Sequence, residues 1–170
     1  MSKGSIETAV AAGESEVRET GRAASKTRLR LWLRILKTSR LIETEVREKL
    51  REEFDSTLPR FDVMAALYRV EAGLRMSDLS SELRVSNGNV TGIVDRLVSD
   101  GLIVRVPVDN DRRATIVRLT NAGRELFQRM ATKHESWVDE ILGGLSTAEA
   151  TRLMATLEAA VHPLEDKESE

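Results

Sequence analysis

Large apolar side chains recur every three or four residues along most of this chain, and the pattern predicts a mainly helical protein. The first expected helix runs from about residue 26 to residue 54, with an apolar stripe and a second apolar face near its start. Because a helix that is apolar on two faces usually packs against two bodies, we expect it to contact its own domain and a partner subunit. The stripe consists of Leu31, Ile35, Ile42, Val46 and Leu50.

The middle of the chain predicts three shorter helices. Pro59 restarts the chain before the first of them, and Gly73 ends it. Ser77 is a candidate N-cap for a short helix over residues 78–83, and a turn at 84–86 leads into the third helix. The third helix turns Val90, Ile93, Val94, Leu97 and Val98 inward and leaves Asn87, Asn89, Thr91 and Arg96 facing outward.

Two segments of alternating apolar and polar residues follow, at 102–106 and 114–119, and such alternation is typical of β-strands. A charged turn with the sequence Asp-Asn-Asp-Arg-Arg separates them at 109–113. A helix-turn-helix followed by a β-hairpin predicts a winged helix-turn-helix, which lays a helix in the major groove of DNA with a β-ribbon beside it. The expected fold class is therefore mainly α, with a small β-hairpin wing and long dimerisation helices.

The last third of the chain predicts two more helices. Thr120 or Asn121 can cap a long helix that reaches Leu142, and a capping box at 146–149 (Ser-Thr-Ala-Glu) starts the final helix. Both chain ends are poor in large apolar side chains, which favours disorder. The expected organisation is a disordered arm (1–26), a first dimerisation helix (27–58), a DNA-binding lobe (59–120), C-terminal dimerisation helices (121–164) and a disordered tail (165–170).

Composition narrows the function classes. The 170 residues include no cysteine, which excludes disulfides and a thiol redox sensor. No segment approaches the roughly 18 consecutive apolar residues of a membrane span, and no apolar signal-peptide region is present, so a cytoplasmic protein without membrane contact is expected. The net charge of −2 gives no indication of nucleic-acid binding. Any DNA contact must therefore come from locally clustered arginines.

Small polar residues at the start of the outward-facing helix are candidates for DNA contact. Asn side chains bond to adenine edges, and Ser and Thr bond to bases or phosphates. Gly88 and Gly92 each cost the helix about 1 kcal/mol relative to Ala. Their presence suggests that the surface of a partner approaches the helix backbone closely. For Gly88, the alternative is a loosely formed start of the helix. We expect the arginines of the wing turn to enter a minor groove or to pair with phosphate. The alternative is that the turn is a charged turn exposed to solvent, without a role in DNA binding. The candidates are Ser77, Ser86, Asn87, Gly88, Asn89, Thr91, Arg96, Arg112 and Arg113.

Four short motifs occur in a fixed order: Asp-Arg-Leu-Val at 95–98, Gly-Leu-Ile-Val-Arg at 101–105, Asp-Arg-Arg at 111–113, and Leu-Thr followed by Ala-Gly within 119–123. With them, the segment 76–126 resembles the MarR family of bacterial transcriptional regulators. The resemblance implies an obligate homodimer of triangular shape, whose long first helix and last two helices form the interface. It also implies that two wings flank a pseudo-palindromic operator in double-stranded DNA.

The flanking helices extend this resemblance to about residues 28–163. It further implies that Asp95 pairs with Arg113 and so ties the wing to the DNA-contacting helix, and we assign Asp111 to the same wing-orienting group. In that case Arg113 is partly structural, and Arg112 is the better candidate for direct groove contact.

Members of this family bind small ligands, often aromatic acids or their thioesters, in a cleft between the DNA lobe and the dimer helices. Several cations of the first helix lie beside Trp32, with no acidic residue before Glu43, which suits an anionic ligand with an apolar body such as an aryl-CoA thioester. The segments 29–43 and 58–64 look like the branch that responds to hydroxycinnamoyl-CoA. For the aromatic and Met residues, a plain core role is the alternative. The ligand candidates are Arg30, Trp32, Arg34, Leu36, Lys37, Arg40, Arg60, Phe61, Met64, Phe127, Met130, His134 and Trp137.

Enzyme chemistry finds no support in the sequence. We see no nucleophile–base pattern and no phosphate-binding loop, and His134 and His162 lie on different helices, so neither a metal nor a cofactor is expected. The sequence thus favours a ligand-responsive DNA-binding regulator, a repressor released by a small aromatic effector. The alternatives are a winged-helix interaction module that binds no DNA, or a regulator of the same fold that senses a different ligand.

Overall fold

The computed structural model describes the backbone of residues 3–108 and 111–168, and the side chains of residues 23–86, 88–107 and 115–162. The chain forms two units, Met1–Glu45 and Val46–Glu170, each of which is described by itself. The wing turn at 109–110 and the ends of the chain thus lie outside the described residues.

The first unit consists of helix α1 (Lys3–Phe54) as far as Glu45; the rest of the helix belongs to the second unit. The helix begins at Lys3, whereas the sequence predicted a disordered arm over 1–26. Ala and Glu, both good helix formers, are frequent there, so a helix forms without the large apolar residues on which the prediction depended. Helix α6 (Thr147–Glu168) likewise extends into the segment from residue 165 that the sequence predicted to be a disordered tail.

Helix α2 (Leu58–Arg69) begins as the sequence indicates. Thr57 is its N-cap, with the hydroxyl oxygen accepting the backbone N–H of Arg60 at 3.4 Å, and Pro59 occupies its first turn. The helix ends at Arg69, earlier than the predicted Gly73. Gly73 instead serves the turn that follows: it has φ +89°, and a Cβ there would lie 2.6 Å from the carbonyl oxygen of Val117.

The sheet has three antiparallel strands in the order β1-β3-β2, one more than predicted. These strands are β1 (Leu74–Arg75), β2 (Ile103–Val108) and β3 (Asp111–Leu119). In register, Leu74 faces Val117 and Ile103 faces Leu119. Strand β1 has only two residues, which is too short for alternation to be detected in the sequence.

Helix α3 (Met76–Glu82) follows β1 directly, so the prediction of Ser77 as its N-cap was wrong. The pairing of Arg75 with Ile116 fixes where the strand ends, and Arg75 takes the cap position. Ser77 lies within the first turn, where its hydroxyl donates to the carboxylate of Asp78 at 3.1 Å.

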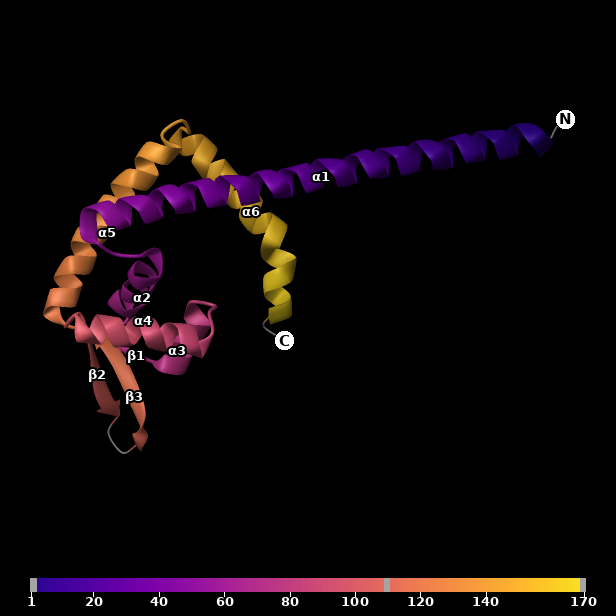
Figure 1. The fold of residues 1–170 in the computed structure, drawn as a ribbon. Coiled ribbons are helices and arrows are strands. Elements are labelled where there is room, and N and C mark those ends of the chain that lie inside the picture. The colour runs from indigo at the N-terminus through magenta and orange to yellow at the C-terminus, as the bar shows by residue number, and fades with distance from the viewer. Residues whose placement is uncertain (1–2, 109–110, 169–170) are drawn as a thin grey trace. The chain divides into compact units, whose positions relative to one another are not determined.

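The remaining helices are α4 (Asn87–Ser99) and α5 (Asn121–Leu142). Thr120 caps α5 by accepting the N–H of Gly123 at 3.0 Å, and a Cβ on Gly123 would collide with the carbonyl oxygen of Leu102. The capping box of α6 is also present, since Ser146 and Glu149 exchange hydrogen bonds. Figure 1 shows α2, α3 and α4 beside the sheet, with the β2–β3 hairpin extending beyond them. These elements confirm the predicted mainly helical fold with a small wing.

The core of the second unit lies where these helices meet the sheet. Its fully buried side chains come from α1, α2, α3, α4, β2, β3 and α5. They include Leu50, Met64, Leu67, Leu79, Val90, Val94, Leu97, Ile103, Val117 and Met130.

Candidate nucleic-acid interface

The turn between α3 and α4 sets the position of α4. Arg84 lies in the left-handed region with φ +52°, and the N–H of Val85 donates to the carbonyl of Ser80 at 3.2 Å. On the inner side of α4, Val90 and Val94 are completely buried. Burial of this stripe holds the opposite face of the helix toward solvent.

The exposed face of α4 carries the side chains that the sequence placed there. Asn89, Thr91 and Arg96 are exposed, as predicted, whereas the side chain of Asn87 lies outside the described ones. Ser86 occupies the N-cap position without making a side-chain capping bond. Ser86 and Ser77 are also exposed, so both hydroxyls lie at the surface.

Gly88 and Gly92 lie on this exposed face in open space. Apart from its own helical neighbours, a Cβ at either position would meet none of the described atoms within 4 Å, and neither glycine has a positive φ. Intramolecular packing therefore does not require glycine, although each glycine costs a helix about 1 kcal/mol relative to Ala. The missing side chains leave the backbone of α4 accessible to an outside surface.

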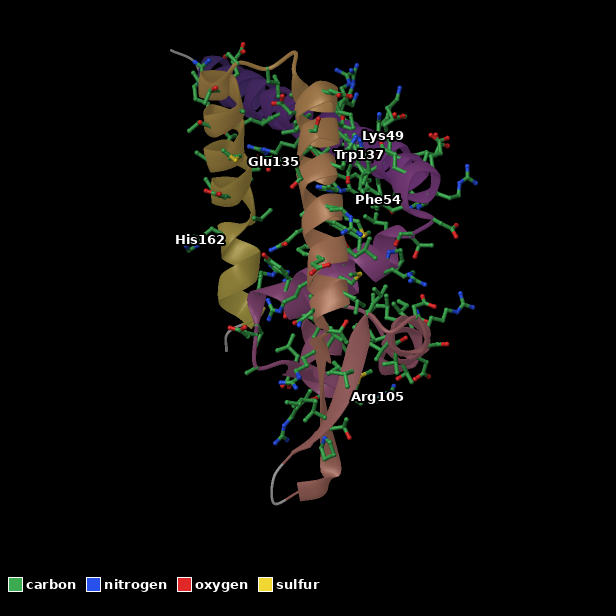
Figure 2. All side chains as sticks on the ribbon, turned by 90° about the vertical axis from the view of Figure 1, so that its left-hand side faces the viewer. Lys49, Phe54, Arg105, Glu135, Trp137 and His162 are labelled. Atoms are coloured by element: carbon green, nitrogen blue, oxygen red, sulfur yellow. The ribbon has the colours of Figure 1, made fainter. Side chains whose placement is uncertain are left out.

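The wing is joined to α4 by an ion pair that the sequence did not reveal. Arg105 of β2, which is labelled in Figure 2, donates to the carboxylate of Asp95 of α4 at 2.6 Å. The side chains of Asp111, Arg112 and Arg113 lie outside the described ones, so the proposed Asp95–Arg113 pair stays a prediction. The alternation of apolar and polar residues in the sequence indicated on which face of the strand Arg105 lies. Only the packing of β2 against α4 brings the side chain of Arg105 to Asp95.

The predicted ligand residues of α1 lie at the surface of the chain. Trp32 is 54% exposed, and Leu36 is partly buried. The cations of this group are Arg30, Arg34, Lys37 and Arg40, and all are exposed.

The predicted ligand residues of α2 and α5 pack among themselves instead. Met64 and Met130 have no exposed surface. The ring of Phe61 stacks on His134 with centroids 4.8 Å apart and lies 5.4 Å from Phe127. These side chains fill the space between the two helices, which fits the core role left open above.

The last two predicted ligand residues already have polar partners. Arg60 pairs with the carboxylate of Asp100 at 2.5 Å. Trp137 is 3% exposed, donates its indole N–H to Glu53 at 3.2 Å, and contacts Phe54 edge to face (Figure 2). The structure thus gives both residues packing roles that their sequence spacing did not reveal.

Within the described part of the chain, no three His, Asp or Glu side chains come together as a metal site. No helix there combines the length and the apolar character needed to cross a bilayer.

A helix-turn-helix with an exposed polar second helix and an attached β-hairpin defines a winged helix-turn-helix protein. The family model described as "MarR family" matches residues 54–114. The transcriptional repressor IacR of Pseudomonas putida is 30% identical over 122 residues, which cover 72% of each chain. The chain therefore belongs to the MarR family of transcriptional regulators.

Two other comparisons describe the breadth of this likeness. The transcriptional activatory protein BadR of Rhodopseudomonas palustris is 34% identical over 101 residues, but the match spans only 58% of this chain and 58% of BadR. The structure of a mutant MarR from E. coli complexed with operator DNA aligns with a TM-score of 0.68 and 26% identity, covering 77% of this chain and 93% of that one.

Proposed function

We propose that this protein is a homodimeric regulator that binds a pseudo-palindromic operator in double-stranded DNA and represses transcription until a small aromatic effector releases it. The observation that carries the proposal is the exposed face of α4, where polar side chains alternate with two open glycines. The E. coli MarR complex with operator DNA, which has the same fold, supports it.

In the proposed complex, α4 enters the major groove. Asn89 and Thr91 bond to base edges, and the backbone at Gly88 and Gly92 comes close to the DNA because no side chain stands between them. Arg112 of the wing contacts the adjacent minor groove or a phosphate. Asp95 holds β2 through Arg105 and so fixes the direction of the wing relative to α4.

Exposed apolar side chains on α1 and α6 support dimerisation. Such side chains rarely form contiguous patches on monomers, and both helices belong to the predicted dimer interface. A twofold dimer presents its two α4 helices to half-sites that are about one helical turn apart. The exposed side chains are Leu29, Leu31, Trp32, Leu33, Ile35 and Leu41 of α1, and Leu153, Met154, Leu157 and Val161 of α6.

For the effector we propose an aryl-CoA thioester of the hydroxycinnamoyl type. The exposed cations of α1 between Arg30 and Arg40 support an anionic ligand. Whether the protein represses or activates transcription does not follow from the effector, because its relatives include both kinds of regulator. BadR is named an activator and IacR a repressor.

The test is fluorescence anisotropy with the DNA upstream of the protein's own gene, alone and with p-coumaroyl-CoA, p-coumarate or CoA. Tight binding that the thioester alone relieves would support the full proposal. Tight binding that none of the three changes would retain the DNA-binding function and contradict the effector.

Arg112→Ala provides the second arm, because loss of a phosphate contact lowers both the affinity and its salt dependence. Arg69→Ala is the matched control, since Arg69 of α2 pairs with Glu82 of α3 and not with a residue of α4 or the wing. A stably folded protein that binds no DNA duplex even at low salt would favour the protein-interaction module. Non-specific DNA binding is strongest at low salt, so its absence under that condition would be decisive.

A further inference from the structure

A short turn at residues 100–102 joins helix α4 to strand β2 of the wing, the two elements that we propose contact DNA. Asp100 is the C-cap residue of α4, and the N–H of Leu102 donates to the carbonyl of Leu97 at 2.9 Å, which closes the helix. Gly101 between them has φ +72°, a conformation that favours glycine. Because α4 ends and the wing begins within these residues, a displacement of the turn would move both elements.

The start of α5 holds the backbone of this turn. The hydroxyl of Thr120 donates to the carbonyl of Gly101 at 2.8 Å, and the N–H of Thr120 donates to the carbonyl of Leu102 at 3.0 Å. Gly123 packs so closely against the Leu102 carbonyl that a Cβ would collide with it. These contacts fix carbonyl groups of the turn and leave the side chain of Asp100 to another partner.

The start of α2 holds the turn through that side chain. Nη2 of Arg60 donates to Oδ2 of Asp100 at 2.5 Å. The α2 cap fixes the backbone of Arg60, since the hydroxyl of Thr57 accepts its N–H. The side chain of Arg60 is 22% exposed and that of Asp100 is 45% exposed, so the pair is partly shielded from solvent.

The geometry of the Arg60–Asp100 pair is poor for stability. Nε of Arg60 is buried and has no hydrogen-bond partner among the described residues. A guanidinium binds a carboxylate most strongly through two parallel N–H groups, and a buried donor without a partner costs free energy. This cost offsets the gain from the bond to Asp100. We therefore expect the pair to act on the position of the turn more than on the free energy of unfolding.

We propose that Arg60 is a positioning residue for operator binding. Through Asp100 it fixes the turn from which α4 and the wing both extend, and it does not itself touch DNA. Without this pair the turn keeps its contacts with α5 but loses the one with α2, so that α4 and the wing no longer have one fixed direction. The inference rests on the proposed function, because it concerns the elements that we propose contact the operator.

The first experiment measures operator binding and stability of the full chain with Arg60→Met, which removes the charge and keeps an apolar side chain. We expect operator binding to weaken about tenfold, while the salt dependence of the affinity stays unchanged, because no phosphate contact is lost. The urea midpoint and the affinity for a duplex of unrelated sequence should also stay unchanged. Arg60→Lys should restore most of the operator affinity, because the pair uses a single nitrogen atom of Arg60.

Arg124→Met is the matched control for the loss of charge. The side chain of Arg124 is shielded to a similar degree, with 28% exposed, but it pairs with Glu71 and not with the turn. This variant should keep operator affinity within about twofold of the wild type. Asp100→Ala should weaken operator binding as much as Arg60→Met, and the double variant should weaken it no further, because each substitution removes the same contact.

Three results would overturn the proposal. The first is full operator affinity in Arg60→Met. The second is a lower salt dependence, which would make Arg60 a phosphate contact. The third is a urea midpoint that falls together with the affinity and that Arg60→Lys does not restore, which would make the residue structural.

Hydrogen exchange measured by NMR tests the positioning step without DNA. We expect the amides of Asp100, Leu102 and Thr120 to exchange about fivefold faster in Arg60→Met, while the buried core residue Leu67 of α2 keeps its rate. Equal exchange at the turn in both proteins would overturn the inference. A wild-type protein that binds no DNA at low salt would contradict the proposed function instead, and hydrogen exchange would still decide whether Arg60 holds the turn.

Discussion

Arg105 of β2 and Asp95 of α4 form an ion pair at 2.6 Å that connects the wing to the helix proposed to enter the major groove. Both side chains are partly exposed, at 39% and 54%, so the pair contributes only about 0–1 kcal/mol to stability. We expect its effect to be geometric, because the pair adds a polar contact to the packing of β2 against α4 and so helps to hold the direction of the hairpin.

Asp95→Asn should therefore lower operator affinity about tenfold while changing the free energy of unfolding by less than about 1 kcal/mol. The wing loses its orientation, but nothing in the core changes. Urea denaturation and DNA anisotropy measure the two effects. Glu82→Gln, which removes the exposed Arg69–Glu82 pair between α2 and α3, is the control and should alter neither value appreciably. A large loss of stability in Asp95→Asn would show that the pair is structural.

Gly92→Ala should change stability and DNA binding in opposite directions. Open space surrounds the position, so Ala should stabilise the free protein by about 1 kcal/mol. The added methyl group would then lie between α4 and the DNA and weaken operator binding. Gly123→Ala is the contrast, because its Cβ collides with the carbonyl of Leu102 and must destabilise the protein. A stabilised Gly92→Ala protein with full DNA affinity would contradict the close approach.

Trp137 is expected to be the most sensitive contact between α5 and the end of α1. Trp137→Ala should cost about 3–5 kcal/mol, because it empties a buried site and removes the edge contact with Phe54. Trp137→Phe should cost about 1 kcal/mol, close to the value of the lost hydrogen bond to Glu53. Urea denaturation at one fixed protein concentration compares them. Lys133→Gln removes the exposed ion pair to the same Glu53 and should cost less than about 0.5 kcal/mol.

Glu149 should titrate below its usual pKa of 4.5, because the hydroxyl and the backbone N–H of Ser146 both donate to its carboxylate. A carboxyl group whose pKa is lowered by folding adds stability above its unfolded pKa. That contribution disappears as the pH falls through the lowered value. NMR titration of the Glu149 side chain gives the pKa, and Ser146→Ala should return it toward 4.5. An unshifted pKa in the wild-type protein would contradict the capping box.

Local sequence determined most of the elements of this protein, because caps, turns and apolar periods depend on neighbouring residues. The Thr57 and Thr120 caps follow from such signals, and so does the Ser146–Glu149 box. The buried stripe of α4 likewise gave its outward face, and with it the candidate DNA contacts.

Tertiary structure decided the features that depend on residues far apart in the chain. Strand β1 exists because it pairs with β3, and that pairing moved the start of α3 ahead of Ser77. Packing of β2 against α4 selected Arg105 as a partner of Asp95. The aromatic and Met residues of α2 and α5 have one periodic pattern whether they line a cleft or fill a core, and only packing density distinguishes the two.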